Sequence, residues 1–328
     1  MRILIEGRDL SGYLAKCHEA FRHGLRATYD ARCFGEGYPG FDPTIKTYSQ
    51  MIRHVFPDAE PDIILLGRYD ENTPAYRGLA RVAPLKGLIL SDYWIIRDER
   101  FDEFVDLITR NRIDFILSYF PQPLDIWGQT PIGDRFIYFP VSFDPEIFKD
   151  WKMPRTYDVG FLAYGTSSFS AFYPERHRIH QKLLENQKIR YLWARHPGFE
   201  IFQGVHSLVG AQFSKAMNSC RVFITTGSQY RNPHAKYVEA IASKTMLLAD
   251  EPEGVAELRL KDGVNYVKMT EDTLFDLLGD YLPKHELCEQ IAEQGYRTAL
   301  QYHTCYARAR DFERMITSRF PSLLRRVN

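Results

Sequence analysis

The sequence lacks a net charge and any long apolar run. Lys+Arg and Asp+Glu both total 42 in a chain of 328 residues, so the formal net charge is zero. Proteins that bind along a nucleic-acid backbone need a basic excess, so nucleic acid is not an expected general partner. No stretch approaches the roughly 18 apolar residues of a membrane-spanning helix. Glu6 interrupts the apolar start of the chain, and we therefore expect no signal peptide.

Cysteine is scarce as well. The five cysteines are widely spaced and odd in number, and none forms a C-x-x-C pair. Thiols scattered in this way are typical of reduced proteins, and they argue against a disulfide framework or a structural zinc site. The chain also has no N-x-S/T sequon. We therefore expect a cytoplasmic protein.

Several catalytic signatures are missing. The chain contains no D-x-D, Walker loop, nucleophile elbow or H-E-x-x-H, which removes support for the corresponding hydrolases and triphosphatases. A sugar nucleotide clamped by a metal ion usually relies on a close pair of carboxylates, so we expect chemistry without a metal. His177 and His180 lie three residues apart on a predicted helix, but Arg176 and Arg178 would repel a cation there. We interpret that stretch as a solvated helix face.

What the chain does have is an alternation of short β-rich apolar runs with helical stretches. This pattern predicts βαβ units and a mostly parallel sheet. Hydrophobic residues make up 45% of the chain, enough for a sizeable core, and a length prior of roughly 150 residues per domain suggests two domains. The pattern restarts after a segment between Phe143 and Arg155 that Pro145 and Pro154 break. We therefore predict an α/β protein with two doubly wound, Rossmann-like domains.

The expected elements alternate along both halves of the chain. The strands are expected at Arg2–Glu6, Ala27–Phe34, Asp62–Gly67, Lys86–Ser91, Asp114–Ser118, Ile137–Pro140, Asp158–Ala163, Ile189–Ala194, Arg221–Thr225 and Met246–Ala249. The helices are expected at Tyr13–Leu25, Ile45–Val55, Glu99–Asn111, Pro174–Asn186, Gln212–Asn218, Lys236–Ser243, Thr273–Leu278, His285–Tyr302 and Thr304–Ser318. In parallel sheets, ligands bind outside the carboxyl ends of the strands, so the loops that follow strands are the candidate sites.

Two glycine-rich turns were weighed as phosphate sites. Gly35–Gly40 matches G-x-G-x-x-G, but Pro39 removes an amide and no helix follows at once, so we interpret it as a loop. The turn from Gly7 to Gly12 follows a predicted strand directly. Two interpretations of that turn stay open: a close approach of backbone to phosphate, or ordinary strand-to-helix turn chemistry.

The most informative segment runs from His234 to Asp250. Lys236 and Glu239 lie three apart, so they share one face near the start of a predicted helix. A cation and helix-end amides suit a diphosphate there, and the carboxylate of Glu239 can accept hydrogen bonds from a ribose diol. Taken alone, the pair is better described as a surface ion pair.

This segment resembles the donor-binding helix of GT-B glycosyltransferases, whose pattern is basic-x-x-Glu-Ala-x-Ala-small. Phe139–Phe148 resembles the family's inter-domain connector, and Glu253-Gly254 with Asp262–Val267 resembles the stretch after the donor helix. The end of the chain is similar to bacterial spore-maturation-type glycosyltransferases of group 1. The resemblance covers about Phe139 to Ile316.

The resemblance implies a GT-B architecture of two Rossmann-like domains facing a central cleft. Residues 1–150 would bind the acceptor, residues 151–303 would bind the nucleotide-sugar donor, and the helix in 304–328 would cross back to the first domain. The implied activity is metal-independent transfer of a sugar from a UDP- or GDP-linked donor to a hydroxyl of a glycan or small-molecule acceptor. No cofactor other than this co-substrate is expected.

The resemblance also implies which residues bind the donor. Glu239 would hold the ribose, and Lys236 and His234 would lie near the diphosphate. Hydroxyls and amides of Thr166 and Ser167 would add donors to phosphate. Gly12, Arg231 and Tyr237 complete the expected donor-binding set.

Two positions depart from the family pattern. Retaining members often carry a second Glu where this chain has Arg231, and the Gly usual after the helix is Lys244. Arg231 leaves retention and inversion both open. A binding protein without turnover and a sugar-nucleotide epimerase therefore remain as alternatives.

The catalytic base is expected in the first half. Asp92 follows a predicted strand and precedes Tyr93 and Trp94, two aromatics able to stack on a sugar ring or exclude water. Asp9 is the competing candidate. A turn cap is the structural alternative for either residue.

Overall fold

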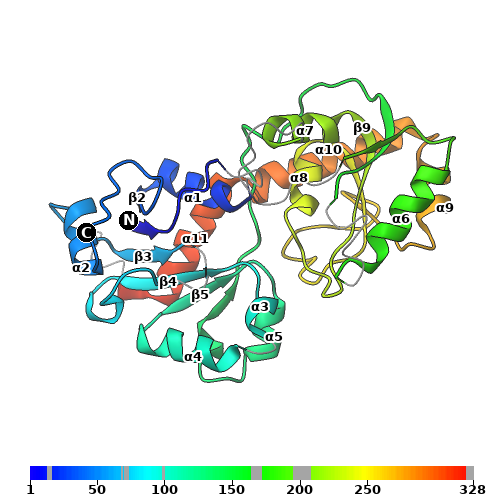
Figure 1. Ribbon diagram of the computed structural model, residues 1–328. Coiled ribbons are helices and arrows are strands. Elements are labelled where there is room, and N and C mark those ends of the chain that lie inside the picture. The colour runs from blue at the N-terminus through cyan, green and yellow to red at the C-terminus, as the bar shows by residue number, and fades with distance from the viewer. Residues whose placement is uncertain are drawn as a thin grey trace. The chain divides into compact units, whose positions relative to one another are not determined.

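The computed structural model describes residues 1–12, 17–67, 69, 74–97, 100–163, 172–194 and 208–322. The chain divides into two compact units, and each contains one sheet (Figure 1). Unit 1 comprises Met1–Leu10, Arg22–Pro140 and Ala309–Asn328. Unit 2 comprises Ser11–Phe21 and Val141–Arg308.

The sheet of unit 1 has six parallel strands in the order β2-β1-β3-β4-β5-β6. Its strands are β1 (Arg2–Glu6), β2 (Asp30–Phe34), β3 (Ile63–Leu66), β4 (Leu85–Leu90), β5 (Phe115–Ser118) and β6 (Phe136–Tyr138). All four residues of β3, Ile-Ile-Leu-Leu, are buried. A continuous apolar run is typical of a parallel strand that is covered on both faces.

Helices cover the sheet of unit 1. They are the unit 1 part of α1 (Cys17–Thr28), α2 (Tyr48–Val55), α3 (Trp94–Arg97), α4 (Phe101–Arg110), α5 (Gln122–Trp127) and the unit 1 part of α11 (Cys305–Arg319), with 3-10 turns at Leu79–Arg81 and Gly133–Arg135. A capping box of Thr47 and Gln50 fixes the start of α2. The Phe312 ring of α11 lies 6.2 Å from that of Phe115, so the end of the chain contributes to this core.

The sheet of unit 2 has five parallel strands in the order β11-β10-β9-β7-β8. Its strands are β7 (Tyr157–Phe161), β8 (Tyr191–Trp193), β9 (Cys220–Thr225), β10 (Met246–Ala249) and β11 (Val267–Lys268). Its helices are α6 (Pro174–Glu185), α7 (Gly210–Asn218), α8 (Lys236–Ala242), α9 (Leu274–Tyr281) and α10 (His285–Tyr302). Side chains of α6, α9 and α10 pack with β9 and β10 in one buried cluster, while α7 and α8 also contact β9.

The two sheets share a strand order. Counted from the first strand of each unit, both orders run second, first, third, fourth, fifth, and unit 1 adds its sixth strand at the end. The connections therefore reverse direction between β1 and β3 in unit 1, and between β7 and β9 in unit 2. Such a switch point is where open parallel sheets bind ligands, outside the carboxyl ends of the strands.

The expected fold class is confirmed, because both sheets are parallel and helices flank them. The segments α10 and β10 have the predicted bounds. The short helices α3 and α5 and the two-residue strand β11 were not predicted. Among the described residues, no helix is both long and apolar enough to cross a bilayer.

One interpretation of α6 is wrong. The stretch with His177 and His180 was expected to be a solvated face, but Arg176 is 2% exposed and His180 is 5% exposed. His180 lies 2.8 Å from the Tyr191 hydroxyl and its ring packs against Trp193 of β8. The charged residue types suggested solvent, whereas the helix turns these two side chains inward.

A buried histidine joins α10 to α11. His303 is fully buried; its Nε2 lies 2.8 Å from the Leu258 carbonyl and its Nδ1 lies 2.7 Å from the Arg308 guanidinium. The carbonyl needs a donor and the guanidinium has no acceptor, so the neutral tautomer with a proton on Nε2 satisfies both contacts. Burial and the Arg308 charge lower the pKa of His303 to about 3.

Candidate functional site

The candidate site lies where β9 and β10 end. These strands are parallel neighbours, so the loop after β9 and the residue after β10, Asp250, meet at one sheet edge. The Asp250 carboxylate accepts hydrogen bonds from Gly227 N, at 2.9 and 3.1 Å, and from the Tyr237 hydroxyl. Tyr237 is fully buried in α8. This contact ties the start of α8 to the ends of both strands.

Glu239 is the buried carboxylate of this site. It lies in the first turn of α8 and is 6% exposed. Burial raises its pKa to about 7, and the charge of Lys236 opposes that shift. Among the residues that the structure describes, none donates a hydrogen bond to the Glu239 side chain. An unpaired acceptor in this position suits a ligand that brings hydroxyl donors.

The first amides of α8 are already engaged. Tyr237 N donates to the His234 carbonyl at 3.2 Å, and the amides of Val238 and Glu239 donate to the Ala235 carbonyl at 3.0 and 2.9 Å. These amides therefore do not point at a ligand, contrary to the expected role of the helix end. Lys236, which is half-buried, supplies a cation in this turn.

A buried guanidinium supports the loop after β9, and sequence reasoning missed it. Arg176 of α6 donates to the Thr226 carbonyl at 2.6 Å and contacts Thr226 Oγ1 at 3.3 Å. Its guanidinium also lies 3.6 Å from the Tyr173 ring centroid. Desolvation lowers the pKa of Arg176, but a guanidinium keeps its proton in proteins. Sequence spacing alone gives no signal that α6 and this loop meet.

His234 lies at the same point. Its Nε2 lies 2.8 Å from Arg176 Nη2 and 2.7 Å from the Thr226 carbonyl. One nitrogen thus faces a donor and an acceptor, and each tautomer satisfies one of the two. The His234 ring also packs 5.1 Å from that of Tyr237. His234 therefore helps to hold the loop after β9 in place.

Arg231 lies in the loop with a left-handed backbone, at φ 53°. Its guanidinium donates to the Glu251 carbonyl at 2.7 and 3.1 Å and pairs with Glu253 at 3.2 Å. These contacts are exposed and hold the loop against the residues that follow β10. The structure accounts for the arginine as a link between these two loops.

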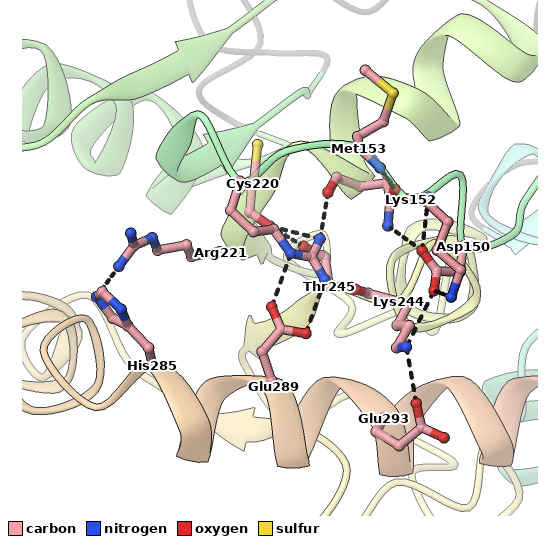
Figure 2. A network of polar contacts seen from close by, with 12 residues as sticks. Asp150, Lys152, Met153, Cys220, Arg221, Lys244, Thr245, His285, Glu289 and Glu293 are labelled. Atoms are coloured by element: carbon pink, nitrogen blue, oxygen red, sulfur yellow. Dashed lines mark hydrogen bonds and ion pairs between the residues drawn. The ribbon is translucent and has the colours of Figure 1, made fainter.

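Lys244, the second departure from the family pattern, follows α8 at its other end. Its backbone is left-handed, at φ 52°, which favours glycine. Figure 2 shows its ammonium between Asp150 and Glu293, 3.1 Å from each carboxylate. Arg155 donates to the Lys244 carbonyl at 2.5 Å. These contacts offset the conformational cost of a side chain at this position.

A surface hollow beside this cluster does not belong to the candidate site. It lies at the end of α8 opposite to the carboxyl ends of the strands. Its lining residues are Lys244, Glu286, Glu289, Gln290, Glu293 and Gln294. Because five of the six come from one face of α10 near their paired cations, we interpret the hollow as part of the ion-pair network.

The two base candidates lie at the carboxyl edge of unit 1. Asp92 follows β4, is half-buried and accepts from the Ser91 hydroxyl at 3.3 Å. Asp9 follows β1, and its amide donates to the Glu36 carbonyl at 2.8 Å. Tyr93 is 1% exposed among other aromatic rings, so it is not available to stack on a sugar as expected.

The remaining residues that the sequence suggested for phosphate or donor binding are not part of the described site. Gly12 lies in an exposed turn. Thr166 and Ser167 lie outside the described residues. The G-x-G-x-x-G stretch from Gly35 to Gly40 is a loop, as expected. The described site is therefore the loop after β9, the first turn of α8, and Asp250.

Comparisons with known proteins bear on the fold and the family. Residues 169–314 match a family model described as glycosyl transferase-like. HepE of Anabaena, solved with UDP-glucose, is 14% identical with a TM-score of 0.64, and the match covers 97% of this chain and 100% of HepE. Sucrose-phosphate synthase of Thermosynechococcus elongatus is 9% identical with a TM-score of 0.61, covering 98% and 100%. A glycosyltransferase of Rickettsia africae is 10% identical with a TM-score of 0.57, covering 97% and 98%. No curated protein sequence matches the chain.

Proposed function

We propose a donor and a mechanism for this chain, which belongs to the GT-B glycosyltransferases of the group 1 type. The donor is a sugar joined to a nucleoside diphosphate, either UDP or GDP. The observation that carries the proposal is the buried carboxylate of Glu239, which has no donor among the described residues. A ribose diol offers two hydroxyl donors to such a carboxylate. HepE, of the same fold, was solved with UDP-glucose.

The proposed reaction moves the sugar to a hydroxyl of a glycan or small molecule. The acceptor oxygen attacks the anomeric carbon, the bond from that carbon to the diphosphate breaks, and the nucleoside diphosphate leaves. Lys236 faces the diphosphate and stabilises the charge that develops on it. His234 contributes by holding the loop. The acceptor proton needs a carboxylate as general base, for which Asp92 is the first candidate and Asp9 the second.

Glu239→Gln tests donor binding. We expect affinity for the bound nucleotide sugar to fall roughly 10- to 100-fold, since a hydrogen bond to a charged group contributes about 1.5–3 kcal/mol. Calorimetry with UDP, GDP, UDP-glucose and GDP-mannose identifies which ligand the wild type binds and measures the loss. Glu293→Gln, which changes the carboxylate paired with Lys244, is the matched control and should leave affinity unchanged. Equal affinity in Glu239→Gln and wild type would contradict the proposal.

The same experiment has a pH dependence. Glu239 must be ionised to accept two hydrogen bonds, and its pKa is raised to about 7 by burial. Affinity for UDP-glucose should therefore rise about tenfold between pH 6 and pH 8, as the ionised fraction grows. Glu239→Gln should show no such rise.

Metal independence is also proposed. The sequence has no D-x-D, and Lys236 supplies a cation beside Glu239. Turnover should persist in EDTA. Complete loss in EDTA, with recovery on adding Mn²⁺ or Mg²⁺, would overturn this part of the proposal and leave the donor assignment standing.

A further inference from the structure

One arginine holds α8 at its C-terminal end. Arg155 belongs to the segment before β7, and its side chain is 18% exposed. Its Nη2 donates to the Lys244 carbonyl at 2.5 Å. Its Nη1 donates to the carbonyls of Asn218 and Cys220, the latter at 3.2 Å. Figure 2 shows Cys220 and Lys244 within this network.

The three carbonyls belong to the ends of different elements. Asn218 is the last residue of α7, Cys220 is the first residue of β9, and Lys244 follows the end of α8. The last carbonyls of a helix have no partner within that helix and carry partial negative charge, so a cation beside them is stabilising. Arg155 therefore joins the end of α8 to the end of α7 and to the start of β9.

All five N–H groups of Arg155 are engaged. Besides the three carbonyl contacts, its Nε and Nη2 donate to the Glu289 carboxylate of α10 at 2.9 and 3.3 Å. A guanidinium carries its five donors in one rigid plane, so these partners are held at fixed positions relative to one another. Arg155 has no donor left for a ligand, and its role is to hold groups of the protein.

The contact at Lys244 reaches Glu239 through one turn of α8. Ser243 directly precedes Lys244, and its amide donates to the Glu239 carbonyl at 2.9 Å. Asp150, in the same segment as Arg155, pairs with the Lys244 ammonium at 3.1 Å. The segment before β7 thus holds both the backbone and the side chain of Lys244, one helical turn from the Glu239 backbone.

The helix α8 is short, so its placement depends on contacts at both ends. It has seven residues, and isolated helices shorter than about 12 residues are marginal in water. At its start, the Tyr237 hydroxyl is bonded to Asp250. At its end, the contact of Arg155 with the Lys244 carbonyl has the same effect. Loss of the second contact would let the helix shift and let water approach Glu239.

We propose that Arg155 is a positioning residue for the nucleotide sugar: it acts through Lys244 to keep α8, and with it the buried carboxylate of Glu239, in place. This inference rests on the proposed function. It gives the segment before β7 a part in binding the nucleotide, although Arg155 itself makes no contact with the ligand.

Arg155→Lys and Arg155→Met test this role by calorimetry at two pH values. At pH 8, affinity for the nucleotide sugar that the wild type binds, UDP-glucose or GDP-mannose, should fall roughly 5- to 10-fold, because the displaced carboxylate makes a weaker hydrogen bond. At pH 6, affinity should stay within about twofold of wild type. Water that reaches Glu239 lowers its pKa from about 7 towards the ordinary value near 4.3, and the larger ionised fraction at pH 6 offsets the displacement.

Two control variants separate this role from a structural one. Glu289→Gln removes the charge from the ion pair but leaves the three carbonyl contacts of Arg155, so affinity should stay within about twofold at both pH values. Arg190→Lys disrupts another bidentate pair of unit 2, in which Arg190 donates to Asp158 at 2.7 and 3.2 Å. It should lower the melting temperature slightly and leave the affinity and its pH dependence unchanged.

Thermal unfolding checks that the Arg155 variants are folded at the temperature of the assay, and Arg155→Lys keeps a cation at the helix ends for this purpose. Wild-type affinity of Arg155→Lys at pH 8, losses of equal size at pH 6 and pH 8, or failure of both variants to fold would each overturn the positioning role. The loss of affinity in Glu239→Gln would still support the proposed function in those cases. A wild type that binds none of UDP, GDP, UDP-glucose and GDP-mannose would overturn the proposed function, and this inference with it.

Discussion

The two units share a strand order but use the switch point differently. In each, the helix after the first strand places a buried arginine near the strand ends, Arg22 in unit 1 and Arg176 in unit 2. Arg22 lies against Gly7 and Gly67 and donates to the Arg8 carbonyl at 2.8 Å and the Tyr38 hydroxyl at 3.0 Å.

Arg176 instead holds the loop after β9 in unit 2 by donating a hydrogen bond to the Thr226 carbonyl. Among the residues that the structure describes, none donates a hydrogen bond to the Glu239 carboxylate of that unit. The same topology thus gives each unit a switch point at the carboxyl ends of its strands. The side chains at that point decide which unit can bind a ligand.

Replacing each arginine by methionine should give the largest loss of stability, and it tests whether the two switch points differ. Arg22→Met and Arg176→Met keep much of the buried volume but leave carbonyl oxygens unpaired, so each should lower the free energy of unfolding by roughly 3 kcal/mol. Urea denaturation measures this loss. Only Arg176→Met should also weaken binding of the nucleotide sugar, by calorimetry, because it releases the loop before α8. A similar loss of binding in Arg22→Met would show that the switch points do not differ in this way.

Acidification should show how much buried, neutral His303 of unit 2 contributes to the free energy of unfolding. His303 in the folded chain stays neutral down to about pH 3, whereas an unfolded histidine takes up its proton near pH 6.5. The stability that depends on neutral His303 is complete above pH 6.5 and is lost as the pH falls below it. From pH 6.5 to pH 5, the wild type should lose about 2 kcal/mol more than His303→Gln. Urea denaturation at both pH values measures the difference, and equal losses would contradict burial of a neutral imidazole.

A methyl group at Gly67 should give a smaller effect. A Cβ there would meet Arg22 Nη2 at 2.3 Å and the Glu6 carbonyl at 2.9 Å. We expect Gly67→Ala to cost about 1–3 kcal/mol through this overpacking. Gly279→Ala, in α9 with nothing within 4 Å of the added atom, should instead stabilise by about 0.5–1 kcal/mol. Thermal unfolding of both variants checks the contrast, and a neutral Gly67→Ala would mean that Arg22 moves aside at no cost.

The sequence predicted the sheets and their flanking helices because buried parallel strands are short apolar runs. The spacing of Lys236 and Glu239 also placed both in the first turn of α8. The sequence could not identify Arg176, because the contact between α6 and the loop after β9 joins residues 50 positions apart. Tyr93 shows the opposite error: an aromatic beside a strand end suggested a ligand, but the core of unit 1 encloses it.

Lys244 has a consequence for how such a chain can change over generations. A lysine with positive φ is tolerated here beside Asp150 and Glu293, which pair with its ammonium. The three residues should therefore be coupled: removing either carboxylate should cost more beside Lys244 than in a Lys244→Gly background. Substitutions at positions 150, 244 and 293 are then expected to have effects that depend on one another.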